Sequence, residues 1–227
     1  MRVLAIDTAL EACSAAILDT DRTDGATSRS VPMTRGHAEA LMPLIAAVMA
    51  EARMEFADLD RVAVTIGPGS FTGLRVGVAA ARGIALAAGK PAIGLTTLAA
   101  LAAPVLEADD GNAVLAVINA RHDRVYMQLF GPGGRSLVPP RVASTRDAIR
   151  AAVARPTRIV GNAAQLIEDA WPDGEPRPLM VSAVSAPDIV SVARLGAASA
   201  DLTAPVKPLY LGDADAHPQE AGIVPRR

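Results

Sequence analysis

The period of hydrophobic and polar positions changes several times along this chain of 227 residues. RVLAID (2–7) is a short apolar run, and ACSAAILD (12–19) follows it after a few turn residues, so we predict two paired strands. ATSRSVPM (26–33) predicts a third strand at a sheet edge, because Pro32 lies near its end. From His37 to about Arg53, apolar residues recur at the spacing of a helix that Pro43 either kinks or delays.

A second strand–helix unit follows. RVAVTIG (61–67) has the length and β-branched content of a buried strand. We predict a long helix over 70–88, with Ser70 as its cap and Gly89 as its stop. PAIGL (91–95) predicts another strand, and 96–107 another helix capped by Thr96 or Thr97.

The same order then recurs in the second half of the chain. VLAVIN (114–119) echoes VLAID (3–7), and strand, strand, strand, helix, strand, helix is predicted twice. A further helix is predicted over 185–200, with Ser185 as its cap. We interpret the repeat as a duplication that forms a two-lobed α/β fold of the actin, sugar-kinase and heat-shock ATPase type. Each lobe would hold a ribonuclease H-like mixed sheet with helices, the first over 1–108 and the second, more degenerate, over 109–227.

Composition narrows the function. Hydrophobic residues make up 51% of the chain, so a core can form, while the net charge of −2 gives no strong basic signal for nucleic acid. Aromatic residues are only 3%, which weighs against a base-stacking surface. Cys13 is the single cysteine and is interpreted as a core residue in a reducing compartment. With neither a signal peptide nor an apolar run long enough to span a bilayer, we expect a soluble cytoplasmic protein without membrane contact.

The stretch from Gly67 to Gly89 begins with a glycine-rich turn, as a phosphate-binding loop does, but it lacks the residues that bind phosphate. A Walker loop needs Gly-Lys-Ser/Thr after four residues, and Thr72 and Gly73 stand at the first two of those places. A dinucleotide fingerprint also fails, because the third glycine comes one residue too late. What remains is a turn that begins a helix of low bulk.

The small residues of this helix fall about one turn apart, at Gly73, Gly77 and Ala80 or Ala81. Each interior glycine costs about 1 kcal/mol against alanine, which is tolerated where two backbones approach closely. Packing on the sheet would explain the glycines, and so would a partner helix. We favour the partner and expect Gly73→Leu or Gly77→Leu to abolish pairing while the fold is kept. The helix from His37 is open to the same two interpretations.

Candidate catalytic groups are sparse. The three histidines, His37, His122 and His217, form no metal-binding pair of helical spacing, so we expect no metal site. No Gly-x-Ser-x-Gly segment supports a hydrolase. Asp7, followed by Thr8, is the best candidate for a residual nucleotide or Mg²⁺ contact, although a turn-capping carboxylate explains it equally well.

Four segments together resemble the TsaB (YeaZ) family: IDTALEACSAAI, HAEALMPLI, GPGSFTGLRVGVAAARGIA and INARHDRVY. GPGSFTGLR is the most specific of them. The resemblance spans most of residues 1–130 and continues to KPLYLGD, where Gly212 replaces the arginine usual in the family. TsaB is the dimerisation subunit of the bacterial machinery for threonylcarbamoyladenosine in tRNA.

This resemblance implies a non-catalytic subunit that binds and activates TsaD, the transferase that acts on the tRNA adenosine beside the anticodon. It implies pairing through helices at about 37–53 and 70–88, a homodimer when alone, a TsaE-like ATPase in the assembly, and tRNA contact only through the complex. No intrinsic cofactor is expected, with ATP or ADP and Mg²⁺ confined to the assembled complex. The expected interface residues are His37, Leu41, Leu44, Ile45, Val48, Gly73, Leu74, Gly77, Val78 and Ala81. The alternative is a small-molecule kinase or ATPase with a degenerate nucleotide site between the lobes.

Overall fold

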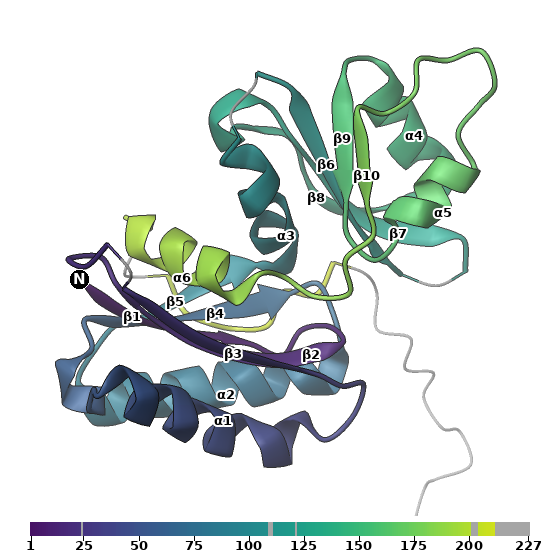
Figure 1. Ribbon diagram of the computed structural model, residues 1–227. Helices are drawn as coiled ribbons and strands as arrows, with labels where there is room; N and C mark the ends of the chain where they lie inside the picture. Colours follow the sequence, from purple (N-terminus) through teal and green to yellow (C-terminus); the bar gives the residue numbers. More distant parts are fainter. Residues whose placement is uncertain (24, 109–110, 121, 201–203, 212–227) are drawn as a thin grey trace, which may run out of the picture.

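Two five-stranded mixed sheets, one in each half of the chain, form the framework of the molecule (Figure 1). The computed structural model describes residues 1–23, 25–108, 111–120, 122–200 and 204–211. The sequence-based remarks on Gly212 and His217 concern positions outside these ranges.

The first sheet has the order β3-β2-β1-β4-β5. β1 pairs with β2 antiparallel and with β4 parallel, so β1 lies at its centre. The strands are β1 (Arg2–Asp7), β2 (Ala12–Asp19), β3 (Ala26–Pro32), β4 (Arg61–Gly67) and β5 (Ala92–Thr96).

The second sheet repeats this arrangement with the order β10-β9-β6-β7-β8. β6 pairs with β7 antiparallel and with β9 parallel, as β1 does with β2 and β4. The strands are β6 (Ala113–Asn119), β7 (Arg124–Phe130), β8 (Ser136–Ser144), β9 (Thr157–Val160) and β10 (Met180–Ser182). The predicted duplication is therefore present in the strand order, although the three-residue β10 was not predicted.

Six α-helices occur in the described residues: α1 (His37–Ala52), α2 (Phe71–Ala88), α3 (Thr97–Leu106), α4 (Thr145–Val153), α5 (Ala164–Asp169) and α6 (Ile189–Ala198). A short 3₁₀ turn, η1 (Phe56–Asp58), lies between α1 and β4, and another, η2 (Pro132–Gly134), lies between β7 and β8. The predicted caps of α2 hold: the Ser70 hydroxyl accepts from Gly73 N, and Gly89 ends the helix with a φ of 65°. Thr96 caps α3. α1 begins at His37 and continues through Pro43.

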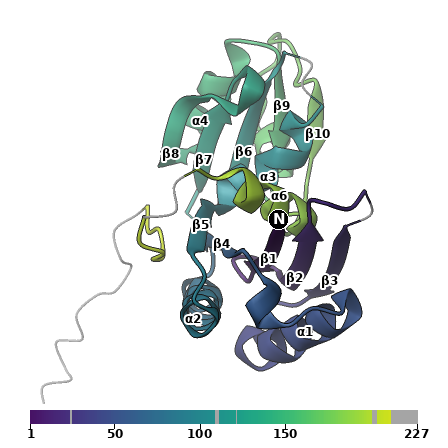
Figure 2. The same cartoon turned by 90° about the vertical axis from the view of Figure 1, so that its left-hand side faces the viewer.

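Helices α1 and α2 cover one face of the first sheet, and α6 with α3 covers the other (Figures 1 and 2). Large aliphatic side chains fill the α1/α2 side, where Cys13 is also buried, as predicted. Burial raises the pKa of the Cys13 thiol to about 11, which keeps it protonated. α2 has the length and composition of a membrane-crossing helix, as core helices of soluble proteins also can. Here its inward face packs on β4.

Helix α6 comes from the second half of the chain but packs on the first sheet. Small side chains line this contact, and a side chain at Gly196 would collide with Ala63 of β4. The predicted cap at Ser185 is wrong, because the helix begins later and the Asp188 carboxylate accepts from Ser191 N at 2.7 Å. At the other end, Arg61 donates to the carbonyl oxygens of Gly196, Ala197 and Ser199.

The segment 204–211, here called the C-terminal strap, also returns to the first sheet. Leu209 N donates to Ile66 O at 2.7 Å, next to the end of β4. Val206 is buried in the first core, and Leu211 packs against the cluster around α3 that joins the two sheets. The strap therefore holds the loop between β4 and α2 in place.

Candidate functional site

The helix pair α1/α2 contains all ten residues expected at a partner interface, and the structure places all ten in the interior. The side chains of α1 in this set, from His37 to Val48, are at most 9% exposed. Those of α2 are buried as well. These side chains therefore pack inside the isolated chain, and their role at a partner interface stays a prediction.

The glycines of α2 make room for a neighbouring segment of the same chain. A side chain at Gly73 would run into the backbone carbonyl of Thr8, and one at Gly77 into the Thr8 hydroxyl. Thr8 also donates to Gly73 O at 2.7 Å. The glycines thus allow the β1–β2 turn to approach α2, and the interpretation as internal packing is the correct one.

The outward face of the same two helices carries a different set of residues. An apolar groove of about 470 Å³ lies between α1, η1 and α2, and Gly83 has open space where a side chain would be. Met42 and Phe56 on its rim are 48% and 38% exposed. The residues that line it are Met42, Phe56, Ala57, Ala80, Gly83, Ile84, Ala87 and Ala88. The sequence signal for this face was the apolar residues at solvent-side positions of two already amphipathic helices.

Asp7, the candidate for a nucleotide contact, is fully buried at the end of β1. Its Oδ1 accepts from the Thr65 hydroxyl and from Ala9 N, and its Oδ2 has no partner among the described residues. Burial raises the pKa of Asp7 to about 6. The hydrogen bonds from Thr65 and Ala9 and the nearby His37 lower this pKa, but by less than burial raises it. The carboxylate therefore offers no exposed oxygen to a phosphate-bound cation.

His37 is buried beside this turn, with Nε2 3.2 Å from Leu10 O. It lies in the first turn of α1, which begins after Gly36. Its ring holds the β1–β2 turn against α1. Within the described residues, no group of three or more His, Cys, Asp or Glu side chains is placed to hold a metal ion.

A polar pocket of about 500 Å³ lies between the lobes. Glu11 and Asn119 both line it, so the turns that follow the first strand of each lobe face one another as the predicted fold requires. Asn162, whose Oδ1 accepts from Asn119 N at 2.9 Å, lies beside them. Asp7 and Thr8 are not among its lining residues. A kinase would need its carboxylate here, and the geometry does not favour that alternative.

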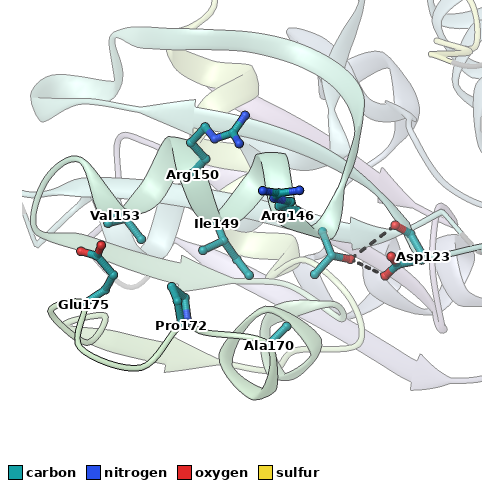
Figure 3. Close-up of a pocket in the computed structure, with 9 residues that line it drawn as sticks. Asp123, Arg146, Ile149, Arg150, Val153, Ala170, Pro172 and Glu175 are labelled. Atoms are coloured by element: carbon teal, nitrogen blue, oxygen red, sulfur yellow. Dashed lines mark hydrogen bonds between the residues drawn. The ribbon is translucent and has the colours of Figure 1, made fainter.

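A further pocket of about 450 Å³ lies in the second lobe between α4 and the residues after α5 (Figure 3). Ile149, Val153 and Pro172 give it an apolar side, while Arg146 and Arg150 extend from α4. Thr145 donates to Asp123 at 2.9 Å at one end. None of the residues expected to function from the sequence lies in this pocket.

Comparisons with known proteins agree with the motifs. The model of a family described as TsaD: tRNA N6-adenosine threonylcarbamoyltransferase matches residues 31–200. The tRNA threonylcarbamoyladenosine biosynthesis protein TsaB of Escherichia coli (strain K12) is 40% identical over 126 residues, which is 56% of this chain and 53% of that protein. The chain thus spans about half the length of this curated relative.

Two longer matches cover nearly the whole chain. An uncharacterized protein of Mycobacterium tuberculosis (strain ATCC 25618 / H37Rv) is 35% identical over 217 residues, 95% of this chain and 94% of that protein. The structure of YeaZ from Pseudomonas aeruginosa superposes with a TM-score of 0.77 at 29% identity, over 92% of this chain and 99% of that one. These matches confirm the resemblance found in the motifs and the two-lobed fold.

Proposed function

Because this chain belongs to the TsaD (tRNA N6-adenosine threonylcarbamoyltransferase) family and is one of its TsaB members, we propose that it is a non-catalytic subunit of the tRNA threonylcarbamoyladenosine pathway. It binds a TsaD-like transferase and activates threonylcarbamoylation of the tRNA adenosine beside the anticodon. The observation that carries this proposal is the 40% identity to a protein named for that pathway.

The arrangement of polar groups supports a role without catalysis. A reacting group has to reach its substrate, but Asp7 is fully buried. Among the described residues that line the interlobe pocket, Glu11 is the single carboxylate, and the carboxamides of Asn119 and Asn162 do not titrate. ATP or ADP with Mg²⁺ would then bind in the assembled complex, and no cofactor would belong to this chain alone.

The outward groove of α1 and α2 is the surface we assign to the partner. Apolar surface that is hollowed and flanked by exposed Met42 and Phe56 is typical of protein contacts, and methionine adapts to a partner's shape. Gly83 lets a helix approach closely, as Gly73 and Gly77 were expected to do. In the absence of the transferase, the grooves of two copies of the chain would pack against each other in a homodimer. A TsaE-like ATPase would join the complex in the cytoplasm.

Co-purification with a TsaD-like subunit tests this assignment. Met42→Glu puts a charge on the rim, and Gly83→Leu fills the groove while improving helix propensity. Both variants are expected to lose the partner without a fall in melting temperature. Leu166→Glu, which changes an exposed leucine of α5 in the second lobe, is the matched control and is expected to pair normally.

The outcomes distinguish a wrong assignment of the partner surface from a wrong function. Pairing that survives both groove variants would show that the partner binds elsewhere. A wild-type chain that neither pairs with a TsaD-like subunit nor raises its transferase activity would contradict the function itself.

A further inference from the structure

The chain has few aromatic side chains, yet two of them meet on its surface. Phe71 is the first residue of α2, and Tyr210 belongs to the C-terminal strap. Their ring centroids lie 5.6 Å apart with a tilt of 34° between the planes. Phe71 is 56% exposed and Tyr210 50% exposed, so their contact leaves much of both rings open to solvent.

Arg75 completes this cluster one turn further along α2. Its guanidinium carbon lies 3.5 Å from the centroid of the Phe71 ring, and its Nε donates to the Tyr210 hydroxyl at 3.2 Å. The cation–π contact and the hydrogen bond fix three side chains that would otherwise rotate freely. Because they are fixed before any partner arrives, binding to them costs little conformational entropy.

The charged side chains in the two described segments that carry the cluster are all positive. Residues 70–90 and 204–211 include Arg75, Arg82, Lys90 and Lys207 but no Asp or Glu. Arg75, Arg82 and Lys207 are exposed. The two arginines share a face of α2 two turns apart, about 10.5 Å along the helix axis. This local excess of cations stands out in a protein whose net charge is −2.

We propose that this aromatic–arginine patch, made of Phe71, Arg75, Arg82, Lys207 and Tyr210, binds single-stranded RNA. An unpaired base stacks on the open side of the aromatic pair, and the cations contact the neighbouring phosphates. The choice of RNA rests on the proposed function, which places the chain beside tRNA. The spacing of the two arginines is wider than the phosphates of one nucleotide, which favours a polynucleotide over a free nucleotide.

This proposal changes two expectations drawn from the sequence. The low aromatic content argued against base stacking, but content does not reveal that Phe71 and Tyr210 meet in space. The chain was also expected to meet tRNA only through the complex, whereas the patch would supply a contact of its own. A protein partner is the competing occupant, and the patch's purely cationic charge favours RNA over it.

Fluorescence anisotropy with a labelled, unmodified tRNA anticodon stem–loop tests the proposal, using the chain alone and its complex with a TsaD-like subunit. Phe71→Leu removes the ring but not the apolar bulk, and is expected to weaken RNA binding five-fold or more. Arg75→Gln and Arg82→Gln are each expected to weaken it and to make its salt dependence shallower. Arg155→Gln, an exposed arginine of the second lobe, is the charge-matched control and should change neither.

All four side chains changed are exposed, and melting temperatures would verify that the variants fold. Wild-type-like RNA binding in the patch variants would overturn the proposal, as would a wild-type chain that binds no RNA in either form. Variants that keep RNA but lose the TsaD-like subunit would identify the patch as a protein contact instead. If the wild-type chain fails to pair at all, the proposed function fails, and the measurement on the chain alone still decides whether the patch binds RNA.

Discussion

Gly73, Gly77 and Gly83 belong to one helix, yet a methyl group at each would meet different surroundings. At Gly73 and Gly77 it would collide with Thr8, and at Gly83 it would meet nothing within 4 Å. We expect Gly73→Ala to lower the free energy of unfolding by about 1–3 kcal/mol through overpacking, since the obstacle is backbone. Gly83→Ala is expected to raise it by about 1 kcal/mol through helix propensity. Urea unfolding of the two variants measures both, and equal effects would contradict the packing described.

The sequence predicted that these glycines serve a close approach, but it could not tell which backbone approaches. The neighbour of Gly73 is Thr8, far away in the chain, and helical spacing carries no information about so distant a contact. For the same reason, the sequence could not predict that the ten residues expected at the interface are buried within the isolated chain. An apolar stripe shows that a helix face is covered, and whether a sheet or a partner covers it depends on tertiary structure.

The ionisation of Asp7 links stability to pH. Burial raises its pKa in the folded protein to about 6 from a usual value of 3.8. The stability that the protonated Asp7 contributes to the folded protein is therefore fully present below pH 3.8 and is lost as the pH rises through 6. The shift corresponds to a loss on the order of 3 kcal/mol.

Asp7→Asn removes this ionisation without changing the size of the side chain. The difference in unfolding free energy between wild type and variant is expected to move in favour of the variant from pH 4 to pH 7. Chemical unfolding at several pH values measures this difference. A constant difference across that range would show that the carboxyl group does not titrate there.

At the scale of elements, helix α6 depends on a strand far from it in sequence. Arg61 of β4 donates to three carbonyl oxygens at the C-terminal end of α6. Its positive charge also interacts favourably with the negative end of the helix dipole. Arg61→Met is expected to cost about 1–2 kcal/mol and to speed hydrogen exchange in the last turn of α6.

Arg194→Gln is the control, because Arg194 forms an exposed ion pair with Glu107 that contributes under about 1 kcal/mol. Exchange in α6 that is equally fast in both variants would contradict the anchoring role of Arg61.

The existence of most elements was predictable, whereas their ends and partners were less so. Ser70 and Gly89 lie at the ends of α2 as predicted, because cap and stop residues act locally. α6 was placed too early, since Ser185 and Asp188 are both good caps and the surrounding contacts selected Asp188. β10 is too short to produce a recognisable alternation.

At the scale of the whole molecule, the two halves share a strand order, but helix α6 of the second half packs on the sheet of the first. β6 to β10 repeat the arrangement of β1 to β5, as the repeated order of elements predicted. α6 and the C-terminal strap both pack against the first sheet, and the hydrophobic periodicity of the sequence does not predict this packing. Surface clusters built from distant segments of the chain, such as the contact of Phe71 with Tyr210, therefore cannot be predicted from one segment at a time.

This packing of α6 predicts how a fragment behaves. A chain of residues 1–108, the first lobe as expected from the sequence, lacks α6 and exposes the small-residue face at Ala5, Ala16 and Ala100. We expect its thermal unfolding to be broad and of low midpoint. Joining residues 186–200 to it through a glycine–serine linker supplies α6 and should raise and sharpen the transition. Equal midpoints by circular dichroism would mean that α6 is dispensable to the first lobe, and a control with Val192→Asp in the linked α6 should abolish the gain, because Val192 is fully buried in that contact.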